Sequence, residues 1–346
     1  MNRLVSCLVL LAALLSLNTC QQANSAATNL PFVKLQGQTM GTYYTVTYSI
    51  ADQVNFQKAI DSVLNALNLE VSTYIPTSTI SSFNQAERGI AFVADEVPHF
   101  AANFNKSREL VALTKGNFEP TIMPLGNYWG FGYTPKNPVT VVDSNKVDSL
   151  KAFVGFDKIM VTNDSIIKKV AGIEVDFSAL AKGYGVDAVS LLLEEKGIEN
   201  YLVDIGGEVR AKGKNAKGMD WTVGINKPQE NVSLTEIVGA VSLINKSMAT
   251  SGNYRNLYEV NGVKYVHTIN PFSGFPEIND LLSASILADD CMTADALATA
   301  CMVMGLEKAY EFIEKLPNVE GYFVFDGEGE GFEIKYTSGM KDLIKM

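Results

Sequence analysis

The stretch CMTADALATACMVMG runs from Cys291 to Gly305 and consists almost entirely of small and apolar residues. This composition predicts a buried helix. Asp295 and Thr299 interrupt it four residues apart, a spacing that places both side chains on one helical face. A carboxylate and a hydroxyl there suit a hard cation such as Mg²⁺, which prefers oxygen ligands. The alternative is a solvent-facing carboxylate beside a threonine that bonds back to its own helix. The apolar neighbours count against it, because an unpaired buried carboxylate is costly.

A second stretch, VDFSALAKGYGVD (residues 175–187), has the pattern of a strand end followed by a helix. Asp176 or Ser178 is expected to cap that helix. The backbone N–H groups at such a helix start favour a bound anion. Simple capping, with Lys182 on the surface, is the alternative interpretation of the same residues.

Two pairs of glycines mark places where another group is expected to approach the backbone. Gly183 and Gly185 stand inside the expected helix, where each costs about 1 kcal/mol relative to alanine. Close packing against them is therefore predicted. In the stretch YLVDIGGE, Gly206 and Gly207 form either a bulge between two strands or a place where a flat ligand lies against the backbone.

The chain has only two histidines. His267 ends an expected strand before the turn at Asn270-Pro271, a good position for an acid, a base or a phosphate donor. A lone histidine is nevertheless more often structural, and His99, at a helix entry, is expected to be so. No Ser-His-Asp order stands out and G-x-S-x-G is absent.

The rest of the chain predicts many short strands between helices. Helices are expected over Asn55–Leu69, Phe100–Thr114, Ser178–Lys196 and, as one long or two short helices, Thr293–Leu316. Strands are expected at Tyr43–Ile50, Ile159–Thr162, Ser165–Lys168, Tyr201–Ile205, Glu208–Lys212, Trp221–Ile225, Ala240–Ile244, Tyr258–Val260, Tyr265–Thr268, Gly321–Phe325 and Phe332–Tyr336. Asn117–Asn137 is expected to be a long ordered loop of the kind that is usually functional. This pattern predicts an α+β fold with mixed, largely antiparallel sheets and packed helices, in one catalytic unit over residues 31–346.

The formal net charge of -10 argues against a nucleic-acid partner, which would require a basic surface. Residues 1–19 have the pattern of a signal peptide, with Arg3 before the apolar run Leu4–Leu17. The following Cys20 resembles the lipidated cysteine of a bacterial lipobox; ordinary signal-peptide cleavage nearby is the alternative. With residues 20–30 as a polar tether, we expect an exported protein, anchored by lipid to the bacterial inner membrane on its periplasmic or outer face.

The cysteines give no sign of a metal or redox motif. Removal of Cys7 with the signal peptide and acylation of Cys20 leave Cys291 and Cys301 in the mature chain. On one continuous helix they lie about 15 Å apart, at about 1.5 Å per residue. That separation is too long for a disulfide. Neither CxxC nor a Cys/His metal spacing is present, so both are expected to be buried thiols.

Eight ordered motifs together resemble the ApbE family, the FAD:protein FMN transferases. The motifs run from Gln38 to about Gly305 and are the MGT start, STYIPTSTISSFN, GNFEPTIMPLGNYWGFG, VDFSALAKGYGVD, YLVDIGGEVRAKG, ATSGNYR, HTINPFSG and MTADALATA. Eight motifs in order are far more specific than any one of them, and an exported lipoprotein also suits this family. The resemblance implies Mg²⁺-dependent transfer of FMN from FAD to a threonine hydroxyl of an acceptor protein, a subunit of a membrane redox complex, with release of AMP.

Position by position, the resemblance implies that Asp295 and Thr299 are metal ligands, with the backbone carbonyl of Ala179 as a third. The FAD contacts that it implies are Met40, Tyr74, Phe118, Glu119, Pro120, Asp176, Lys182 and Ile269. His267 or an acidic neighbour is the candidate for assisting proton transfer, and Asp295 is expected to be catalytic as well as metal-binding. Glu119 departs from the family pattern, which has Asp at that position. Ala298 also departs from it, because some members carry a second Asp there, and this implies fewer charges or one metal ion fewer.

Two other functions stay open at the level of sequence. One is a Mg²⁺-dependent FAD pyrophosphatase, in which water replaces the threonine and the products are FMN and AMP. The other is a non-catalytic, FAD-binding lipoprotein.

Overall fold

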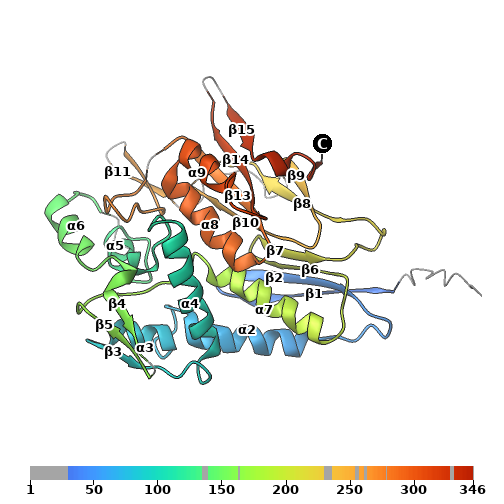
Figure 1. Ribbon diagram of the computed structural model, residues 1–346, viewed down its shortest axis with the longest axis horizontal. Coiled ribbons are helices and arrows are strands. Elements are labelled where there is room, and N and C mark those ends of the chain that lie inside the picture. The colour runs from blue at the N-terminus through green and yellow to red at the C-terminus, as the bar shows by residue number, and fades with distance from the viewer. Residues whose placement is uncertain are drawn as a thin grey trace, which may run out of the picture.

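An antiparallel sheet of eight strands, in the order β1-β2-β6-β7-β10-β13-β14-β15, forms the centre of the computed structural model (Figure 1). The structure describes residues 30–134, 139–162, 164–229, 236–253, 257–260, 263–277, 279–327 and 331–345. The expected signal peptide, Cys20 and the tether as far as residue 29 lie outside the described residues. The strands of the central sheet are β1 (Phe32–Thr39), β2 (Thr42–Ser49), β6 (Tyr201–Ile205), β7 (Glu208–Lys212), β10 (Ser247–Gly252), β13 (Leu281–Ala288), β14 (Glu320–Asp326) and β15 (Phe332–Tyr336).

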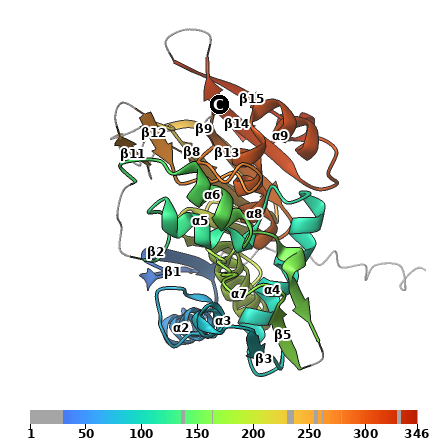
Figure 2. The ribbon, with the colours of Figure 1, turned by 90° about the vertical axis from the view of Figure 1, so that its left-hand side faces the viewer.

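Helices and three small sheets surround the central sheet. The helices are α2 (Gln57–Val71), α3 (Thr79–Gln85), α4 (Pro98–Leu113), α5 (Met123–Tyr128), α6 (Ser144–Lys151), α7 (Ala181–Glu195), α8 (Cys291–Met304) and α9 (Leu306–Ile313). The small sheets have the strand orders β3-β5-β4 (Gly89–Ala91, Ser165–Lys168, Ile159–Val161), β16-β9-β8 (Ile344–Lys345, Ile237–Leu243, Trp221–Asn226) and β11-β12 (Leu257–Val260, Val263–Val266). In both ribbon views α5 and α6 lie between the β11–β12 hairpin and the β3-β5-β4 sheet (Figure 2). The predicted α+β class is confirmed.

The two faces of the central sheet carry different layers, because successive strand residues point to opposite sides. On β14, Phe323 belongs to the core that contains α8, whereas its neighbours Tyr322 and Val324 pack with Trp221 of β8 and Val241 of β9. Helices therefore cover one face of the sheet, and the small β16-β9-β8 sheet covers part of the other.

The first hairpin shows how local sequence determines this architecture. Tyr44, Val46 and Tyr48 alternate along β2 and are buried in one cluster with Ile60 and Leu64 of α2. The two-residue turn before β2 has positive φ at both central positions, 49° and 71°. The second of these is a glycine, which adopts this conformation at no steric cost.

Several expected boundaries and elements require correction. The expected loop over Asn117–Asn137 contains a 3₁₀ turn (Pro120–Ile122) and helix α5. Strands β1, β3, β10, β13 and β16 and helices α3 and α6 were not predicted. Of the two alternatives for Thr293–Leu316, the structure has two helices, because the chain breaks at Gly305, where φ is 75°. The prediction for the remaining cysteines is confirmed: Cys291 and Cys301 are buried and unbridged.

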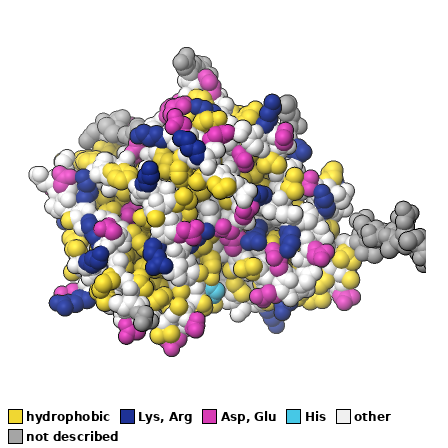
Figure 3. Space-filling model, in the orientation of Figure 1, with side chains coloured by type: hydrophobic (Ala, Val, Ile, Leu, Met, Phe, Trp, Pro, Cys, Tyr) yellow, Lys and Arg dark blue, Asp and Glu magenta, His cyan; other side chains and the backbone are white. Residues whose placement is uncertain are grey.

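The surface and the helices add two observations. On the face shown in Figure 3, Lys and Arg side chains are interspersed with Asp and Glu side chains. Among the described residues, no helix combines the length and apolar character that crossing a membrane requires.

Lys168, on β5, is a buried ammonium whose titration should affect stability. Its Nζ donates to the carbonyl oxygens of Asn84 (3.0 Å) and Ala86 (2.9 Å), and burial lowers its pKa to about 8. Since the ordinary lysine pKa is higher, the folded state disfavours the charged form. Its stabilising contribution is therefore fully present only above the unfolded-state pKa and is lost as the pH falls through about 8.

We expect the unfolding free energy of the natural chain, relative to that of Lys168→Met, to rise between pH 7 and pH 10.5, by at most about 3 kcal/mol. Urea denaturation at both pH values measures this difference. Lys214→Met, which removes an exposed lysine, is measured alongside as the control for a surface site. A constant difference between the natural chain and Lys168→Met would mean that the folded state does not disfavour the buried ammonium.

Candidate functional site

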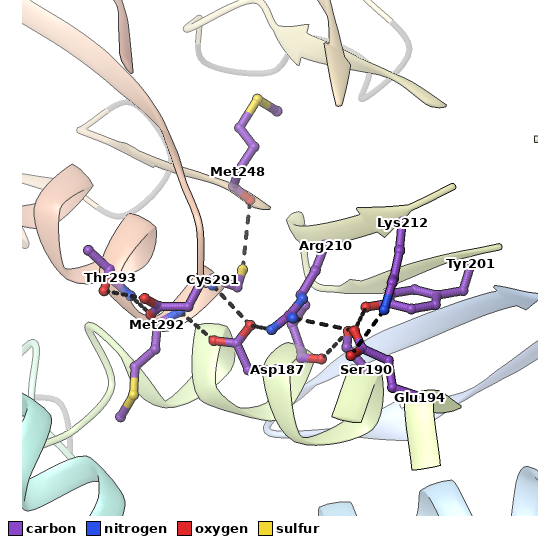
Figure 4. A network of polar contacts seen from close by, with 12 residues as sticks. Asp187, Ser190, Glu194, Tyr201, Arg210, Lys212, Met248, Cys291, Met292 and Thr293 are labelled. Atoms are coloured by element: carbon purple, nitrogen blue, oxygen red, sulfur yellow. Dashed lines mark hydrogen bonds and ion pairs between the residues drawn. The ribbon is translucent and has the colours of Figure 1, made fainter. Parts of the chain in front are cut away.

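Helices α7 and α8 run antiparallel, and each supplies a carboxylate to the N-terminus of the other. Asp187 of α7 accepts hydrogen bonds from the backbone N–H groups of Cys291 (3.0 Å) and Met292 (2.9 Å) (Figure 4). Asp295 of α8 accepts one at Oδ2 from the amide of Gly183 (3.1 Å). These amides belong to first turns, where a helix offers them no partner. The reciprocal caps fix the register of the two helices and hold the Asp295 carboxylate in place.

The capping carboxylate of Asp187 is itself tied to the central sheet. Arg210 on β7 donates to it (2.8 Å) and lies 3.4 Å from Glu194 at the other end of α7 (Figure 4). Glu194 also pairs with Lys212 (3.2 Å) and accepts from the Tyr201 hydroxyl (2.6 Å). Because the network spans α7, α8, β6 and β7, the start of α8 is fixed by three other elements.

The glycines of α7 explain how the two helices come so close. A Cβ atom on Gly183 would lie 2.4 Å from the backbone oxygen of Cys291 and 2.8 Å from the Cα of Met292. The prediction that another group packs closely against the glycines is thus confirmed, and at Gly183 that group is the backbone of α8. A Cβ on Gly185 would meet only the ends of side chains, at 3.2 Å and beyond.

One cavity of about 480 Å³ gathers nearly all the residues that the sequence singled out. The predicted site residues that line it are Tyr74, Phe118, Glu119, Pro120, Asp176, Ala179, Lys182, His267, Ile269, Asp295 and Thr299. Met40 instead lines a second cavity of about 820 Å³, which shares Tyr74 and Lys182 with the first. The fold therefore brings together residues that are more than two hundred positions apart in the sequence.

The polar centre of this cavity contains one ammonium and two buried carboxylates. Lys182 Nζ lies 2.6 Å from Glu208 Oε1 and 3.9 Å from Asp295 Oδ1. Burial raises the pKa of Asp295, and it raises the pKa of Glu208 to about 7, against the opposing effect of the ammonium. Burial lowers the pKa of Lys182, but its two carboxylate neighbours outweigh burial and raise it overall.

Glu208 is a site residue that the sequence analysis missed. Its side chain is buried, and its Oε2 has no hydrogen-bond partner among the described residues. The signal available in the sequence was a carboxylate directly after Gly206-Gly207, at the first position of strand β7. Because the glycines were considered as a bulge or a ligand platform, the carboxylate beside them received no role.

The donor atoms at this centre fit a hard cation. Asp295 offers a carboxylate, Thr299 a hydroxyl that lies 3.2 Å from the Ser251 hydroxyl, and Ala179 lines the same cavity. In the described part of the chain, no three His, Cys, Asp or Glu side chains form a metal-binding group. A metal here must therefore use hydroxyl and carbonyl oxygens in addition to Asp295, a ligand set that Mg²⁺ accepts. Two carboxyl groups share one ammonium at this centre, so its acidic groups outnumber its basic ones.

Two further carboxylates stabilise the cavity wall. Glu119 accepts from the Thr121 amide (3.0 Å) and from the Phe156 amide (3.1 Å). Asp176 accepts from the amide and hydroxyl of Ser178, and so caps the turn before α7. The expectation that Asp176 or Ser178 caps the helix itself was wrong, because α7 begins only at Ala181 and its N-cap is Leu180.

The two histidines occupy different environments. His267 follows β12, lines the cavity with Asp295, and lies with its ring 6.5 Å from that of Phe131. His99 is the second residue of α4, and its Nδ1 lies 3.0 Å from the Tyr184 hydroxyl. The structure therefore brings His267 to the candidate site, while His99 connects α4 to α7.

Comparison with known proteins gives consistent matches. The model of the ApbE family matches residues 40–323. The chain is 38% identical over 312 residues to the FAD:protein FMN transferase of Vibrio cholerae, a match that covers 89% of this chain and 90% of that protein. It is 36% identical over 355 residues to the FAD:protein FMN transferase of Haemophilus influenzae, covering 99% of each. The solved flavin transferase ApbE from Vibrio cholerae matches with a TM-score of 0.80 at 33% identity, over 91% of this chain and 99% of that one.

Proposed function

The chain belongs to the ApbE family, and on this premise we propose that it transfers FMN from FAD to a threonine hydroxyl of an acceptor protein, with Mg²⁺ and with release of AMP. The enzyme class, FAD:protein FMN transferase, is the one that its relatives' names give. The observation that supports the finer chemistry is the shared cavity, which Asp295, Thr299 and Ala179 line together with Lys182, whose Nζ lies 3.9 Å from Asp295 Oδ1.

In the proposed reaction, the acceptor threonine attacks the phosphorus on the FMN side of the FAD pyrophosphate. A phosphorus–oxygen bond to threonine forms, the bond to the bridging oxygen breaks, and AMP departs. The hydroxyl proton passes to a base, for which His267 is the candidate because it lines the cavity. The nucleophile belongs to the acceptor, so the chain needs no activated serine or cysteine of its own.

The chain's own residues prepare the site for this anionic substrate. Asp295, Thr299 and the carbonyl of Ala179 would hold Mg²⁺, which when bound neutralises charge on the pyrophosphate and on the departing AMP. Lys182 supplies a further positive charge near Asp295. Buried Phe118 contributes an apolar wall that limits the access of water, which favours transfer over hydrolysis.

The setting of the reaction is part of the same proposal. The signal-peptide pattern of residues 1–19 and the lipobox-like Cys20 support an exported enzyme, anchored by lipid to the inner membrane on its periplasmic or outer face. The acceptor is then a flavoprotein subunit of a membrane redox complex that exposes its threonine on that side.

We expect the mature chain, given FAD, Mg²⁺ and the flavin-accepting subunit of a membrane redox complex from the same bacterium, to attach FMN covalently to that subunit. AMP should appear in equal amount. Intact mass of the acceptor and chromatography of the nucleotides measure both products, and replacement of the acceptor threonine by alanine should remove both. Equally fast release of FMN and AMP without acceptor would identify a pyrophosphatase instead, and tight FAD binding with neither product would identify a binding protein.

A further inference from the structure

We propose that Glu208 is a positioning residue: it holds the ammonium of Lys182 away from Asp295 and so leaves Asp295 available to the metal ion. This inference rests on the proposed Mg²⁺ site. Glu208 contacts the neighbouring side chain of Lys182 and has no direct part in the chemistry.

The geometry shows that the two carboxylates share Lys182 unequally. Its Nζ is in hydrogen-bonding contact with Glu208 Oε1, at 2.6 Å. The distance to Asp295 Oδ1 is 3.9 Å, which is too long for a hydrogen bond. Asp295 thus accepts a hydrogen bond from the Gly183 amide with one oxygen, and its other oxygen accepts none from the ammonium.

The backbone around Glu208 keeps its carboxylate fixed. It is the first residue of β7, directly after a turn in which the Gly207 amide donates to Asp204 (3.0 Å). In the same turn the Gly206 amide donates to the carbonyl of Tyr43 (3.1 Å). The Glu208 side chain is 5% exposed, whereas that of Lys182 is 31% exposed. The ammonium, on its flexible four-carbon stem, is therefore the partner that can move.

Removal of the Glu208 charge should let the ammonium move to the other carboxylate. Asp295 is the second carboxylate that the structure places near Lys182 Nζ. A direct ion pair there would occupy the oxygen that a divalent cation needs and would place a positive charge next to it. Metal binding would then have to displace the ammonium, which weakens the apparent affinity.

A double-mutant cycle on metal affinity tests this inference without any turnover. The probe is Mn²⁺ in the absence of FAD, with the free ion measured by electron paramagnetic resonance. We expect Glu208→Gln to weaken Mn²⁺ binding by about tenfold or more when Lys182 is present, and by less than about threefold in a Lys182→Met background. Glu208→Asp, which keeps the charge but shortens the reach, should give an intermediate loss.

The controls separate this inference from simpler effects. Glu307→Gln removes a carboxylate from an exposed ion pair with Lys335 (2.8 Å) and should leave Mn²⁺ affinity unchanged. If Glu208→Gln weakens Mn²⁺ binding equally with Lys182 present and in the Lys182→Met background, Glu208 acts on the metal ion only through the electrostatic effect of its own charge. That result would overturn the positioning role. No loss in either background would overturn it too. If Asp295→Ala binds Mn²⁺ as well as the natural chain does, the proposed metal site itself is wrong.

Discussion

Asp295→Ala should lower the kcat/KM of FMN transfer by at least about 10²–10³-fold, the usual effect of removing one electrostatic stabiliser from an active site. Asp295 supplies the only carboxylate among the three proposed ligands, and neither the Thr299 hydroxyl nor the Ala179 carbonyl carries a formal charge that would replace it. The rate at which the acceptor gains covalent flavin measures the effect, at several Mg²⁺ concentrations.

Two control variants separate this loss from damage to the helix. Asp295→Asn keeps an oxygen for the Gly183 amide, so it should retain the fold and still lose transfer. Asp290→Ala removes the N-cap of the same helix, which accepts from the Thr293 amide (2.7 Å). It should cost about 1 kcal/mol of stability and leave transfer largely intact. Near-normal transfer by both Asp295 variants would contradict the proposed metal site.

The placement of the polar pair on α8 was predictable from sequence because it depends only on the helical repeat over neighbouring residues. Asp295 and Thr299 share a face at any i, i+4 spacing, and an otherwise apolar helix makes such a pair conspicuous. The same local rule predicted α2 and α4 to within two residues at each end. Ala179 and the predicted FAD contacts came from the family resemblance and not from spacing, and the fold brings all of them except Met40 to one cavity.

Features that depend on pairing across the chain were not predictable in this way. The strand β13 reads LLSASILA and is buried on both faces, so it lacks the alternation that marks a half-exposed strand. Its partner β10 lies more than thirty residues earlier and was considered only as part of a motif. The contact of Glu208 with Lys182 joins β7 to α7, and no local pattern in either segment indicates it.

The start of α7 shows a competition that sequence rules do not resolve. Both Asp176 and Ser178 are good cap residues, yet they hydrogen-bond to each other in the preceding turn. The amide of Gly183 then takes its acceptor from α8, through Asp295. The acceptor for this amide in the first turn of α7 therefore comes from the distant helix α8 and not from the residues that directly precede α7.

Gly183→Ala should therefore be among the most damaging small substitutions in this chain. The added methyl group would lie 2.4 Å from the Cys291 carbonyl oxygen, which belongs to backbone and cannot rotate away. We expect a loss of about 2–3 kcal/mol in unfolding free energy, the range for overpacking a close contact. We also expect at least about a tenfold loss of transfer, because separating the helices shifts Asp295. Urea denaturation and the flavin-transfer rate measure the two effects.

Gly185→Ala is the matched comparison, since it makes the same chemical change two residues along the same helix. Its methyl group would meet the side-chain ends of Ile205, Met40 and Leu64 at 3.2–3.6 Å, and these can adjust. Alanine also favours a helix by about 1 kcal/mol over glycine, so stability should change by less than about 1 kcal/mol. If both variants behave alike, the close approach at Gly183 does not determine the position of α8. If only Gly183→Ala fails, one missing side chain on α7 is what lets the carboxylate of α8 reach the cavity.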